Sequence, residues 1–417
     1  MPENFHIDMP EAVRNIIHTI EEHGFKAYAV GGCIRDSILG RNPDDWDITT
    51  SAVPSQIKTF FKRTVDTGIA HGTVTIMIDK TGYEVTTYRI DGEYEDGRHP
   101  KSVEFSDRLV DDLCRRDFTI NAMAYNDTDG FVDEFKGLDD LDAKIIRCVG
   151  EPELRFTEDA LRMMRAIRFS AQLGFTIDEA TWNAIKKLSP SISKISMERV
   201  HVELGKTLMS AHPDYVAQYS EAGLFAPILP VIDNALKSRY KRKILATLQH
   251  TPDNIYLRYA ALFITSTPDE AAKTLRALKL DNKTVNTVSK LVELSKMDIE
   301  ETEPAVRTAL NKYGRDFLPL WHELMMAVIQ ASEDITGISN PAKVKHLLTL
   351  KRLATDIFAR GDCFTIKALD ISGNDLIEYG LQGHEIGETL KSLLDIVIEN
   401  PKLNDKATLI AMIEHIK

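Results

Sequence analysis

Residues 27–50, AYAVGGCIRDSILGRNPDDWDITT, contain the pattern around which the rest of the chain is organised. The apolar run 27–30 predicts a strand that ends at a glycine pair, and a short helical pattern follows it. A second strand is predicted to carry Asp45 and Asp47. Because successive side chains of a strand point to opposite faces, these two carboxylates would project the same way.

Two parallel carboxylates and a glycine turn are together the parts of a nucleotidyl-transfer site. At a rise of roughly 3.3 Å per residue, the two Cα atoms lie about 6 to 7 Å apart, and the carboxylates can converge on divalent ions. A glycine turn lets the backbone approach a phosphate closely. Each part alone is weak evidence, since acidic and Gly-Gly turns are common on protein surfaces, so the rest of the chain must decide.

Length and composition indicate a multidomain globular protein. A chain of 417 residues predicts two to four domains, and 43% apolar with 27% charged residues is ordinary for a soluble protein. There is no run of about 18 apolar residues, and the first fifteen residues lack the basic-then-apolar pattern of a secretion signal. We therefore expect a cytoplasmic protein.

The charge balance is acidic, with 51 Lys and Arg against 63 Asp and Glu and a net charge of −12. This disfavours wholesale nucleic-acid binding, unless basic residues gather on one face in three dimensions. The four cysteines are scattered without a C-x-x-C or Cys/His spacing. They argue against a zinc site and against a disulfide framework.

The first 150 residues are predicted to form a mixed α/β domain. Helices are predicted at 10–24 and 54–62, and strands at 72–79, 83–90, 122–125, 131–132 and 145–149. A longer helical pattern begins at 107 and contains Arg115, Arg116 and Asp117. The first two of these strands would form a hairpin around a turn at 80–82. Glu84 is a possible third acid beside the carboxylate pair, and a solvated strand residue is equally compatible. The charged, glycine-containing segment 91–102 predicts a loop.

A helix over 158–173, capped by Thr157 and ended by Gly174, opens the second half of the chain. One stripe of it holds charged residues at three-residue steps: Asp159, Arg162, Arg165 and Arg168. Residues three apart on a helix are neighbours, with roughly 5 to 6 Å between their Cβ atoms. The stripe is compatible with ion pairs within the helix or with a bound anion opposite the arginines. Helical patterns then continue to the C-terminus.

The motifs in this order resemble a known family. GGCIRDSILGR, DDWDITT, RRDFTINAMA, EDALRMMRAIRF and SMERVHVEL, spread over 31–204, resemble the successive motifs of the class II tRNA nucleotidyltransferases, the CCA-adding enzymes. The tail resembles the bacterial form without a histidine-aspartate phosphohydrolase domain. The resemblance implies an α+β protein with a polymerase-beta-type head containing a mixed sheet, followed by an all-helical neck, body and tail. The implied ranges are 1–152 for the head, 153–212 for the neck with its nucleotide-selecting helix, 213–300 for the body and 301–417 for the tRNA-binding tail.

The resemblance also implies an activity, partners and site residues. The family adds C, C and A to the 3′ end of tRNA from CTP and ATP, without a nucleic-acid template, and releases pyrophosphate. The expected partners are therefore the tRNA acceptor end and elbow, CTP and ATP, with no membrane; a homodimer is left open. Asp45 and Asp47 are the implied catalytic residues and ligands of two Mg²⁺ ions. The implied nucleotide-binding residues are Gly32, Arg35, Arg116, Asp159, Arg162, Arg165 and Arg168.

Within that set, Asp159 and Arg162 are implied to act as a protein template for the incoming base. Cytosine and adenine both present an amine donor beside a ring-nitrogen acceptor, so a carboxylate that accepts and a guanidinium that donates can satisfy either base. Guanine and uracil present the reverse order and would leave buried groups unpaired, which rejects them. Arg165 and Arg168 suit the triphosphate.

Three alternatives are weighed against this interpretation. Bacterial poly(A) polymerase shares the head, but its basic glycine-arginine-arginine-phenylalanine segment is missing from FKRTVDTGIAHGTVTI at 61–76. An antibiotic nucleotidyltransferase has no reason to carry the charged stripe or the long helical remainder. A non-catalytic RNA-binding relative would be free to lose Asp45 or Asp47, and both are present. The family's segment for switching from C to A addition corresponds to 91–102 and is complete here, which predicts full CCA addition.

Overall fold

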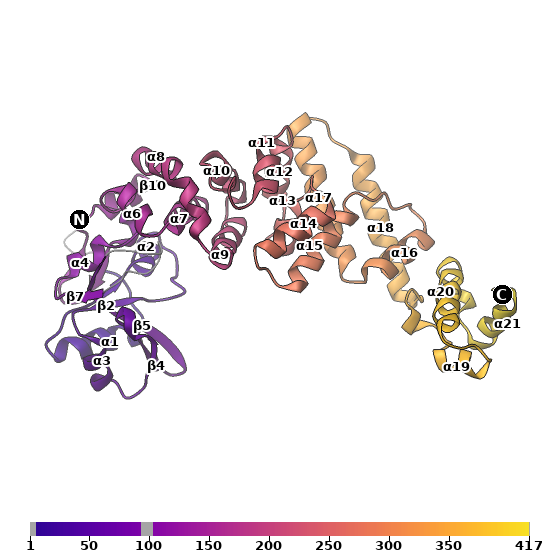
Figure 1. Ribbon diagram of the computed structural model, residues 1–417, viewed down its shortest axis with the longest axis horizontal. Coiled ribbons are helices and arrows are strands. Elements are labelled where there is room, and N and C mark those ends of the chain that lie inside the picture. The colour runs from indigo at the N-terminus through magenta and orange to yellow at the C-terminus, as the bar shows by residue number, and fades with distance from the viewer. Residues whose placement is uncertain (1–5, 93–102, 417) are drawn as a thin grey trace. The chain divides into compact units, whose positions relative to one another are not determined.

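The computed structural model describes residues 6–92 and 103–416 and divides into two compact units, Met1–Asp233 and Asn234–Lys417 (Figure 1). The finer domain boundaries predicted after residues 152, 212 and 300 stay a prediction. Most of the loop predicted at 91–102 lies outside the described residues. No described helix is both long and apolar enough to cross a membrane.

A seven-stranded mixed sheet forms the centre of the first unit, in the order β3-β4-β5-β2-β1-β8-β9. β2 and β5 run parallel, and the other neighbouring pairs are antiparallel. The strands are β1 (Ala27–Val30), β2 (Ile48–Thr50), β3 (Thr64–Gly68), β4 (Thr73–Ile78), β5 (Thr81–Thr87), β8 (Ala124–Asn126) and β9 (Gly130–Val132). The predicted mixed sheet and α+β class are confirmed.

Helices and two small sheets complete the first unit. The helices are α1 (Glu11–Glu22), α2 (Gly32–Ile38), α3 (Pro54–Phe60), α4 (Leu109–Cys114), α5 (Gly137–Asp142), α6 (Pro152–Glu158), α7 (Leu161–Leu173), α8 (Glu179–Leu188), α9 (Met197–Leu208) and α10 (Val216–Glu221). The small sheets pair β6 (Arg89–Asp91) with β7 (Val103–Phe105), and β10 (Ile145–Ile146) with β11 (Thr176–Ile177). Through β10 and β11, the end of the strand-rich region pairs with the segment that follows α7.

The buried central strand β1 is covered by α1. All four residues of β1 are buried, because the strand lies in the middle of the sheet. Helix α1 buries Val13, Ile16, Ile17 and Ile20, whose spacing puts them on one face, and it packs on β1. The strand that ends at the glycine pair is therefore held by β2 and β8 within the sheet and covered by α1.

The predicted hairpin is confirmed, but its details differ. β4 and β5 pair antiparallel around Asp79 and Lys80, whose φ angles of 47° and 72° make a two-residue turn, so the predicted turn at 80–82 is wrong. The predicted strand 83–90 is interrupted at Tyr88, after which β6 pairs in another sheet. The edge strand β3 was not predicted, because its three central residues are exposed and its sequence lacks an apolar alternation.

The helical pattern predicted from residue 107 ends early. Helix α4 stops at Cys114, and Arg115 to Asp117 lie in the turn that follows, not in the middle of a helix. The reason is tertiary: the backbone of Asp117 and Thr119 pairs with the segment 147–149, which draws the chain away from the helix axis. The four cysteines are unpaired; Cys114 is exposed and the other three are buried.

The second unit is helical throughout the residues that the structure describes. Its helices are α12 (Lys241–His250), α13 (Ile255–Leu262), α14 (Pro268–Ala277), α15 (Asn282–Leu294), α16 (Glu303–Tyr313), α17 (Phe317–Thr336), α18 (Pro341–Arg360), α19 (Gly373–Glu378), α20 (His384–Glu399) and α21 (Lys406–Ile416), and α11 (Pro230–Lys237) crosses the boundary between the units. The last helices enclose a core of their own that includes Leu376, Leu393, Val397 and Leu409.

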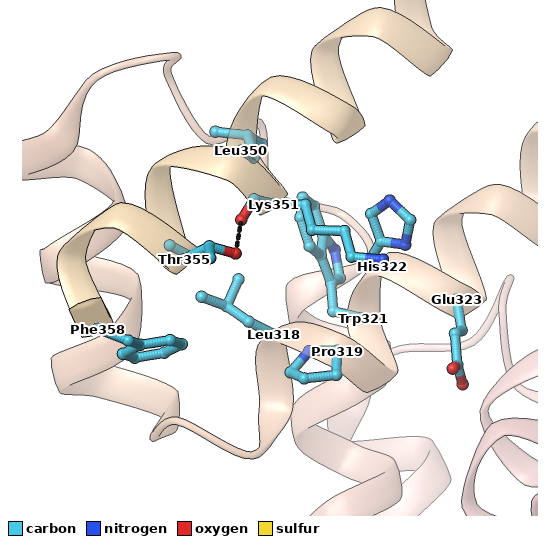
Figure 2. A pocket seen from close by; sticks show the side chains of 10 residues that line it. Leu318, Pro319, Trp321, His322, Glu323, Leu350, Lys351, Thr355 and Phe358 are labelled. Atoms are coloured by element: carbon cyan, nitrogen blue, oxygen red, sulfur yellow. Dashed lines mark hydrogen bonds between the residues drawn. The ribbon is translucent and has the colours of Figure 1, made fainter.

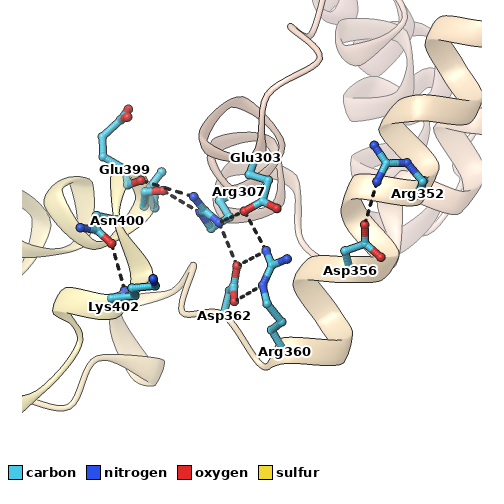
Figure 3. A network of polar contacts seen from close by, with 10 residues as sticks. Glu303, Arg307, Arg352, Asp356, Arg360, Asp362, Glu399, Asn400 and Lys402 are labelled. Carbon is cyan, nitrogen blue, oxygen red and sulfur yellow. Dashed lines mark hydrogen bonds and ion pairs between the residues drawn. The ribbon is translucent and has the colours of Figure 1, made fainter.

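A buried arginine ties this last core to α16 (Figure 3). Arg307 is 2% exposed, and its Nε donates to the carbonyl oxygen of Ile398 at 2.6 Å, near the C-terminal end of α20. Its Nη1 donates to Asp362 at 2.8 Å and to Glu303 at 3.1 Å. Because the last carbonyls of a helix have no partner within it, Arg307 satisfies the end of α20 from a neighbouring helix.

A small cavity lies between α17 and α18 (Figure 2). It has a volume of about 170 Å³, and Leu318, Trp321, Leu350 and Phe358 provide apolar walls. His322 is on its lining, and the Nε2 atom of that ring is buried without a hydrogen-bond partner. Burial, and then the charge of Lys351, lower the pKa of His322.

Candidate active site

The glycine turn after β1 has a backbone conformation that favours glycine and lies close to Arg116. Gly31 has a φ of 85°, which favours glycine, and its N–H donates to the carbonyl oxygen of Met123 in the strand region next to β1. A Cβ at this position would lie 2.8 Å from Nη1 of Arg116. Helix α2 begins at the next residue, Gly32, whose backbone N–H is one of the first in the helix and has no acceptor in the preceding turn.

Asp45 and Asp47 lie side by side just before β2. The strand begins at Ile48, so the prediction that both acids belong to a strand is wrong by a few residues. Their alternation is nevertheless strand-like: Asp45 and Asp47 are exposed, and Trp46 and Ile48 are buried. The reason is that the carbonyl oxygen of Asp47 accepts a hydrogen bond from Val30 of β1 at 3.0 Å, which extends the pairing beyond β2.

The neighbouring strand adds a third acid to this surface. Ile48 pairs with Val85 in the parallel β2–β5 ladder, so Asp47 and Glu84 precede paired residues on adjacent strands. Burial, then the charges of Asp47 and Asp45, raise the pKa of Glu84. Although the Asp47 side chain is exposed on one side, the protein around it excludes part of its water and raises its pKa, with Arg116 acting against this rise and Asp45 adding to it. These carboxylates repel one another, and a divalent cation would relieve that repulsion.

The fit to a metal therefore rests on the pair of acids. Within residues 6–92 and 103–416, no group of three or more His, Cys, Asp or Glu side chains is close enough together to hold a metal ion. Two carboxylates with acceptor-only oxygens fit Mg²⁺ in nucleotidyl-transfer sites, since this ion takes one or two carboxylates together with substrate phosphates. The donor set of Asp45 and Asp47 is consistent with such a site.

Arg116 is held beside the glycine turn by a buried acid that the sequence did not single out. The Asp112 side chain is fully buried, and its Oδ2 accepts from Nη2 of Arg116 at 3.2 Å and from the Thr49 hydroxyl of β2 at 3.1 Å. The other oxygen accepts from Nη2 of Arg115 at 2.7 Å. Burial acts to raise the pKa of Asp112, but the two guanidiniums outweigh it and lower that pKa. Arg116 is thereby fixed near the start of α2.

Asp159 does not lie on the same helix as the arginines that follow it. The predicted helix over 158–173 is two helices, and Asp159 is in extended conformation (φ −142°, ψ 103°) between α6 and α7. Thr157 is not a helix cap, because its hydroxyl donates to the backbone carbonyl oxygen of Glu153 within α6. The Asp159 side chain accepts from the N–H of Leu161 at 3.0 Å, which satisfies one of the first donors of α7.

Both members of the Asp159–Arg162 pair are held by other side chains. Arg199 of α9 donates to Asp159 at 2.7 Å. Arg162 forms an ion pair with Glu158 at 2.6 Å, and its Nη2 donates to the carbonyl oxygen of Arg115 at 2.9 Å. Arg162 is thus tied to Glu158 at the end of α6 and to the backbone of the turn that follows α4.

Arg165 and Arg168, the two remaining arginines of α7, do not form a solvent-exposed stripe. Arg165 pairs with Asp117 at 2.6 Å. Arg168 is 6% exposed, and its Nε donates to Glu203 of α9 at 2.5 Å. The sequence predicts both arginines on one helix face but not their pairing with Asp117 and Glu203, which lie within the RRDFTINAMA and SMERVHVEL motifs.

Three guanidiniums converge on the ring of Phe169. The carbon atoms at the centres of the Arg35, Arg165 and Arg168 guanidiniums lie 5.1, 5.3 and 3.8 Å from the ring centroid. Arg35 comes from α2, and Asn121 accepts from its Nη1 at 2.6 Å. The convergence brings the helix after the glycine turn together with α7, although about 130 residues of sequence separate them.

Comparisons with known proteins match this arrangement along the chain. Residues 27–147 match the Poly A polymerase head domain, 174–236 match the "Probable RNA and SrmB- binding site of polymerase A", and 256–413 match "tRNA nucleotidyltransferase domain 2 putative". The CCA-adding enzyme of Pediococcus pentosaceus is 34% identical over 98% of both chains. That of Levilactobacillus brevis is 36% identical over 99% of this chain and 98% of its own.

The chain belongs to the CCA-adding enzymes.

The fold supports the same assignment. The structure of the Bacillus stearothermophilus CCA-adding enzyme in complex with CTP has a TM-score of 0.75 to this one, with 32% identity over 97% of this chain and 96% of the other. The polymerase-beta-type head and the all-helical remainder are confirmed. As a CCA-adding enzyme, the protein is a nucleotidyltransferase that adds C, C and A to the 3′ end of tRNA, and its family is one that depends on a divalent metal.

The poly(A) polymerase alternative is less well supported. The head match carries that polymerase's name, but it covers only 27–147 and applies to a domain that both enzymes share. The relatives that match almost the whole chain are CCA-adding enzymes. The helical remainder, which an antibiotic nucleotidyltransferase would have no use for, matches a tRNA nucleotidyltransferase domain.

Proposed function

We propose that Asp45 and Asp47 hold two Mg²⁺ ions and that Asp159 and Arg162 choose the incoming nucleotide, while the arginines around Phe169 hold its triphosphate. The observation that carries this proposal is the ion pair between the buried Asp117 and the partly exposed Arg165. It holds α7 against the turn that also supplies Arg116, so metal-binding and base-reading residues belong to one assembly. CTP and ATP are the proposed nucleotides, and tRNA the proposed acceptor.

The catalytic chemistry depends on the paired acids. Bound Mg²⁺ would lower the pKa of the attacking tRNA 3′-hydroxyl and neutralise charge on the triphosphate. The contribution of the protein is to present two ionised carboxylates in fixed positions, with Asp47 anchored through its backbone to β1. Asp47 must be deprotonated for this purpose, and its raised pKa makes metal binding sensitive to acid.

The triphosphate would lie over the start of α2. The Gly32 N–H and the Arg35 and Arg116 guanidiniums are grouped at this turn, and a helix N-terminus favours negative charge. Arg165 and Arg168 extend the positive charge along α7. Arg168 is paired with Glu203, so we propose that it orients the Phe169 ring and its neighbouring guanidiniums more than it contacts phosphate directly.

The base would be read by groups with unused hydrogen-bonding capacity. Within the described part of the chain, Arg162 uses its Nη groups on Glu158, Arg155 and Arg115, and its Nε–H remains. Asp159 accepts from Arg199 and Leu161, and a carboxylate has about four acceptor sites. A donor and an acceptor held this rigidly can match the edge of cytosine or adenine and reject guanine and uracil.

One assay tests the function as a whole. The protein is incubated with Mg²⁺, CTP, ATP and tRNA transcripts that lack the CCA end, and the products are sequenced. Addition that stops after CCA is the expected result, and each nucleotide alone should give only the partial product that its base allows. Long A tails would support a poly(A) polymerase instead, and no extension with either nucleotide would refute the enzyme proposal.

A further inference from the structure

The strongest concentration of positive charge in the chain lies at the start of α12. The seven residues 237–243, KSRYKRK, contain five Lys or Arg side chains, in a protein whose net charge is −12. A tRNA-modifying enzyme with an acidic surface must offer its polyanionic substrate a local basic region, because the overall field repels it.

The basic residues of this segment lie at the N-terminal end of α12, where the helix dipole disfavours positive charge. Lys241, Arg242 and Lys243 occupy the first turn of α12, which contains no acidic residue. The N-terminal end of a helix carries a partial positive charge, so cations there are electrostatically unfavourable. Exposed cations at this end of a helix, here Arg242 and Lys243, break a local electrostatic preference, which is typical of a functional surface.

Three of the cations are exposed and have no acidic partner. Arg239, Arg242 and Lys243 are exposed, and no carboxylate within residues 6–92 and 103–416 forms an ion pair with them. Tyr240 between them is 42% exposed, and the Arg239 guanidinium lies 5.0 Å from its ring centroid. We call Arg239, Tyr240, Arg242 and Lys243 the basic turn.

A hollow next to the basic turn continues the positive surface. It has a volume of about 690 Å³ and is bounded by Lys243 of α12 and by Lys343 near the start of α18, with apolar residues of α17 between them. One acid, Asp298, also lines it, and its carboxylate lies 3.8 Å from the ring of His346. Lys343 is exposed as well, so cations from two helices border one concave surface.

We propose that the basic turn, together with Lys343, binds the sugar-phosphate backbone of the RNA substrate. This inference rests on the proposed function, because it takes tRNA as the polyanion. Arg239 lies just before α12, and Arg242 and Lys243 lie in its first turn, so three exposed cations within five residues of the chain are available to neighbouring phosphates of one strand. Tyr240 offers an exposed ring against a ribose or an unpaired base. Contacts to phosphate position the RNA without reading its sequence.

The test is the salt dependence of tRNA binding by the full-length enzyme. Binding of tRNA lacking its CCA end is measured at several KCl concentrations for the wild type, Arg242→Ala and the triple variant R239A/R242A/K243A. Each lost phosphate contact should reduce the slope of log K against log[salt] by about 0.7 to 0.9, so the triple variant should lose about 2 to 3, with affinity about tenfold weaker or more. The KM for CTP and the rate at saturating tRNA should not change.

Matched controls separate this effect from a change in net charge. The triple variant K187A/K312A/R352A removes three exposed cations that are each paired with an acid, and its slope should stay near that of the wild type. The conservative variant R239K/R242K should keep the wild-type slope, because the effect depends on charge. An unchanged slope in R239A/R242A/K243A would overturn the proposal and point to an acidic protein partner.

Failure of the proposed function would look different: the wild type itself would neither bind nor extend tRNA.

Discussion

The Arg165 guanidinium lies 2.6 Å from the buried Asp117 carboxylate, and this ion pair joins α7 to the turn after α4. Asp117 is 8% exposed, and its Oδ1 also accepts from the side-chain amide of Asn121 at 3.1 Å. Burial acts to raise the pKa of Asp117, but Arg165, Asn121 and Arg162 outweigh it and lower that pKa to about 2. The pair thus serves the stability of the fold as well as the arrangement of the site.

Asp117→Asn should change the pH dependence of folding. An acid whose pKa falls from 3.8 to about 2 on folding contributes about 2 kcal/mol of stability. The stabilisation is fully present at pH values above the pKa of Asp117 in the unfolded state. It is lost as the pH falls through the lower pKa of Asp117 in the folded state. Urea unfolding between pH 5 and 3 should show a shallower loss of stability in the variant than in the wild type. Asp66→Asn, which alters an exposed acid paired with Lys58, should keep the wild-type profile.

Removing either acid of the pair before β2 should abolish nucleotide transfer. We expect Asp45→Ala and Asp47→Ala to lose more than about 100-fold in the rate of CMP incorporation, since even partners outside the ligand set cost 10- to 100-fold. Glu84→Gln should cost less and should shift the Mg²⁺ concentration needed for half-maximal rate. Circular dichroism checks that each variant folds. An Asp45→Ala variant with wild-type rates at saturating Mg²⁺ would contradict the metal-ligand assignment.

Arg199→Ala should weaken base selection although Arg199 is not one of the residues proposed to contact the nucleotide. Arg199 holds Asp159 at 2.7 Å, so its loss frees the carboxylate that is proposed to accept from the base. Incorporation of U and G relative to C and A should rise by about tenfold, the effect of roughly 1.4 kcal/mol, as it should for Arg162→Ala. Lys187→Ala, which breaks an exposed ion pair with Glu153, is the matched control. Unchanged misincorporation in Arg162→Ala would refute the template role.

Arg307→Leu should destabilise the second unit strongly. Its removal leaves the carbonyl oxygens at the end of α20 without their buried donor and Asp362 with only the exposed Arg360, and leaving a buried acceptor unsatisfied costs about 1 to 3 kcal/mol. Arg352→Ala, in the same view, removes an exposed pair with Asp356 and should cost less than about 1 kcal/mol (Figure 3). Chemical denaturation monitored by tryptophan fluorescence compares the two. Equal losses would show that the Arg307 network contributes no more than a surface pair.

His322→Leu should stabilise the protein, more so in mild acid. Nε2 of His322 is buried without a partner, and removing such a group recovers about 1 to 3 kcal/mol. Because the folded state lowers the pKa of this ring below 6.5, the unfolded state binds more protons and the wild type loses stability as the pH falls below that value. The gain in the midpoint of thermal unfolding should be larger at pH 5.5 than at pH 8. An equal gain at both values would contradict the lowered pKa.

The sequence by itself determined the features that depend on residues close together in the chain. The apolar run before the glycine pair, the alternation around Trp46 and the hairpin at β4 and β5 follow from strand periodicity, and all three are present. The order of motifs also identified the family. These signals are local, because strand pleating and turn geometry are set by a residue and its immediate neighbours.

Only the tertiary structure decided how the charged stripe is used. The break at Asp159 and the early end of α4 each follow from contacts with distant segments, and spacing along the chain could not reveal them. Arg199 and Glu203, which hold Asp159 and Arg168, are 40 and 35 residues away from them in sequence. The physical reason is that a buried charge takes whichever partner the packing of the chain brings within reach, and helical spacing describes only the neighbours on its own helix.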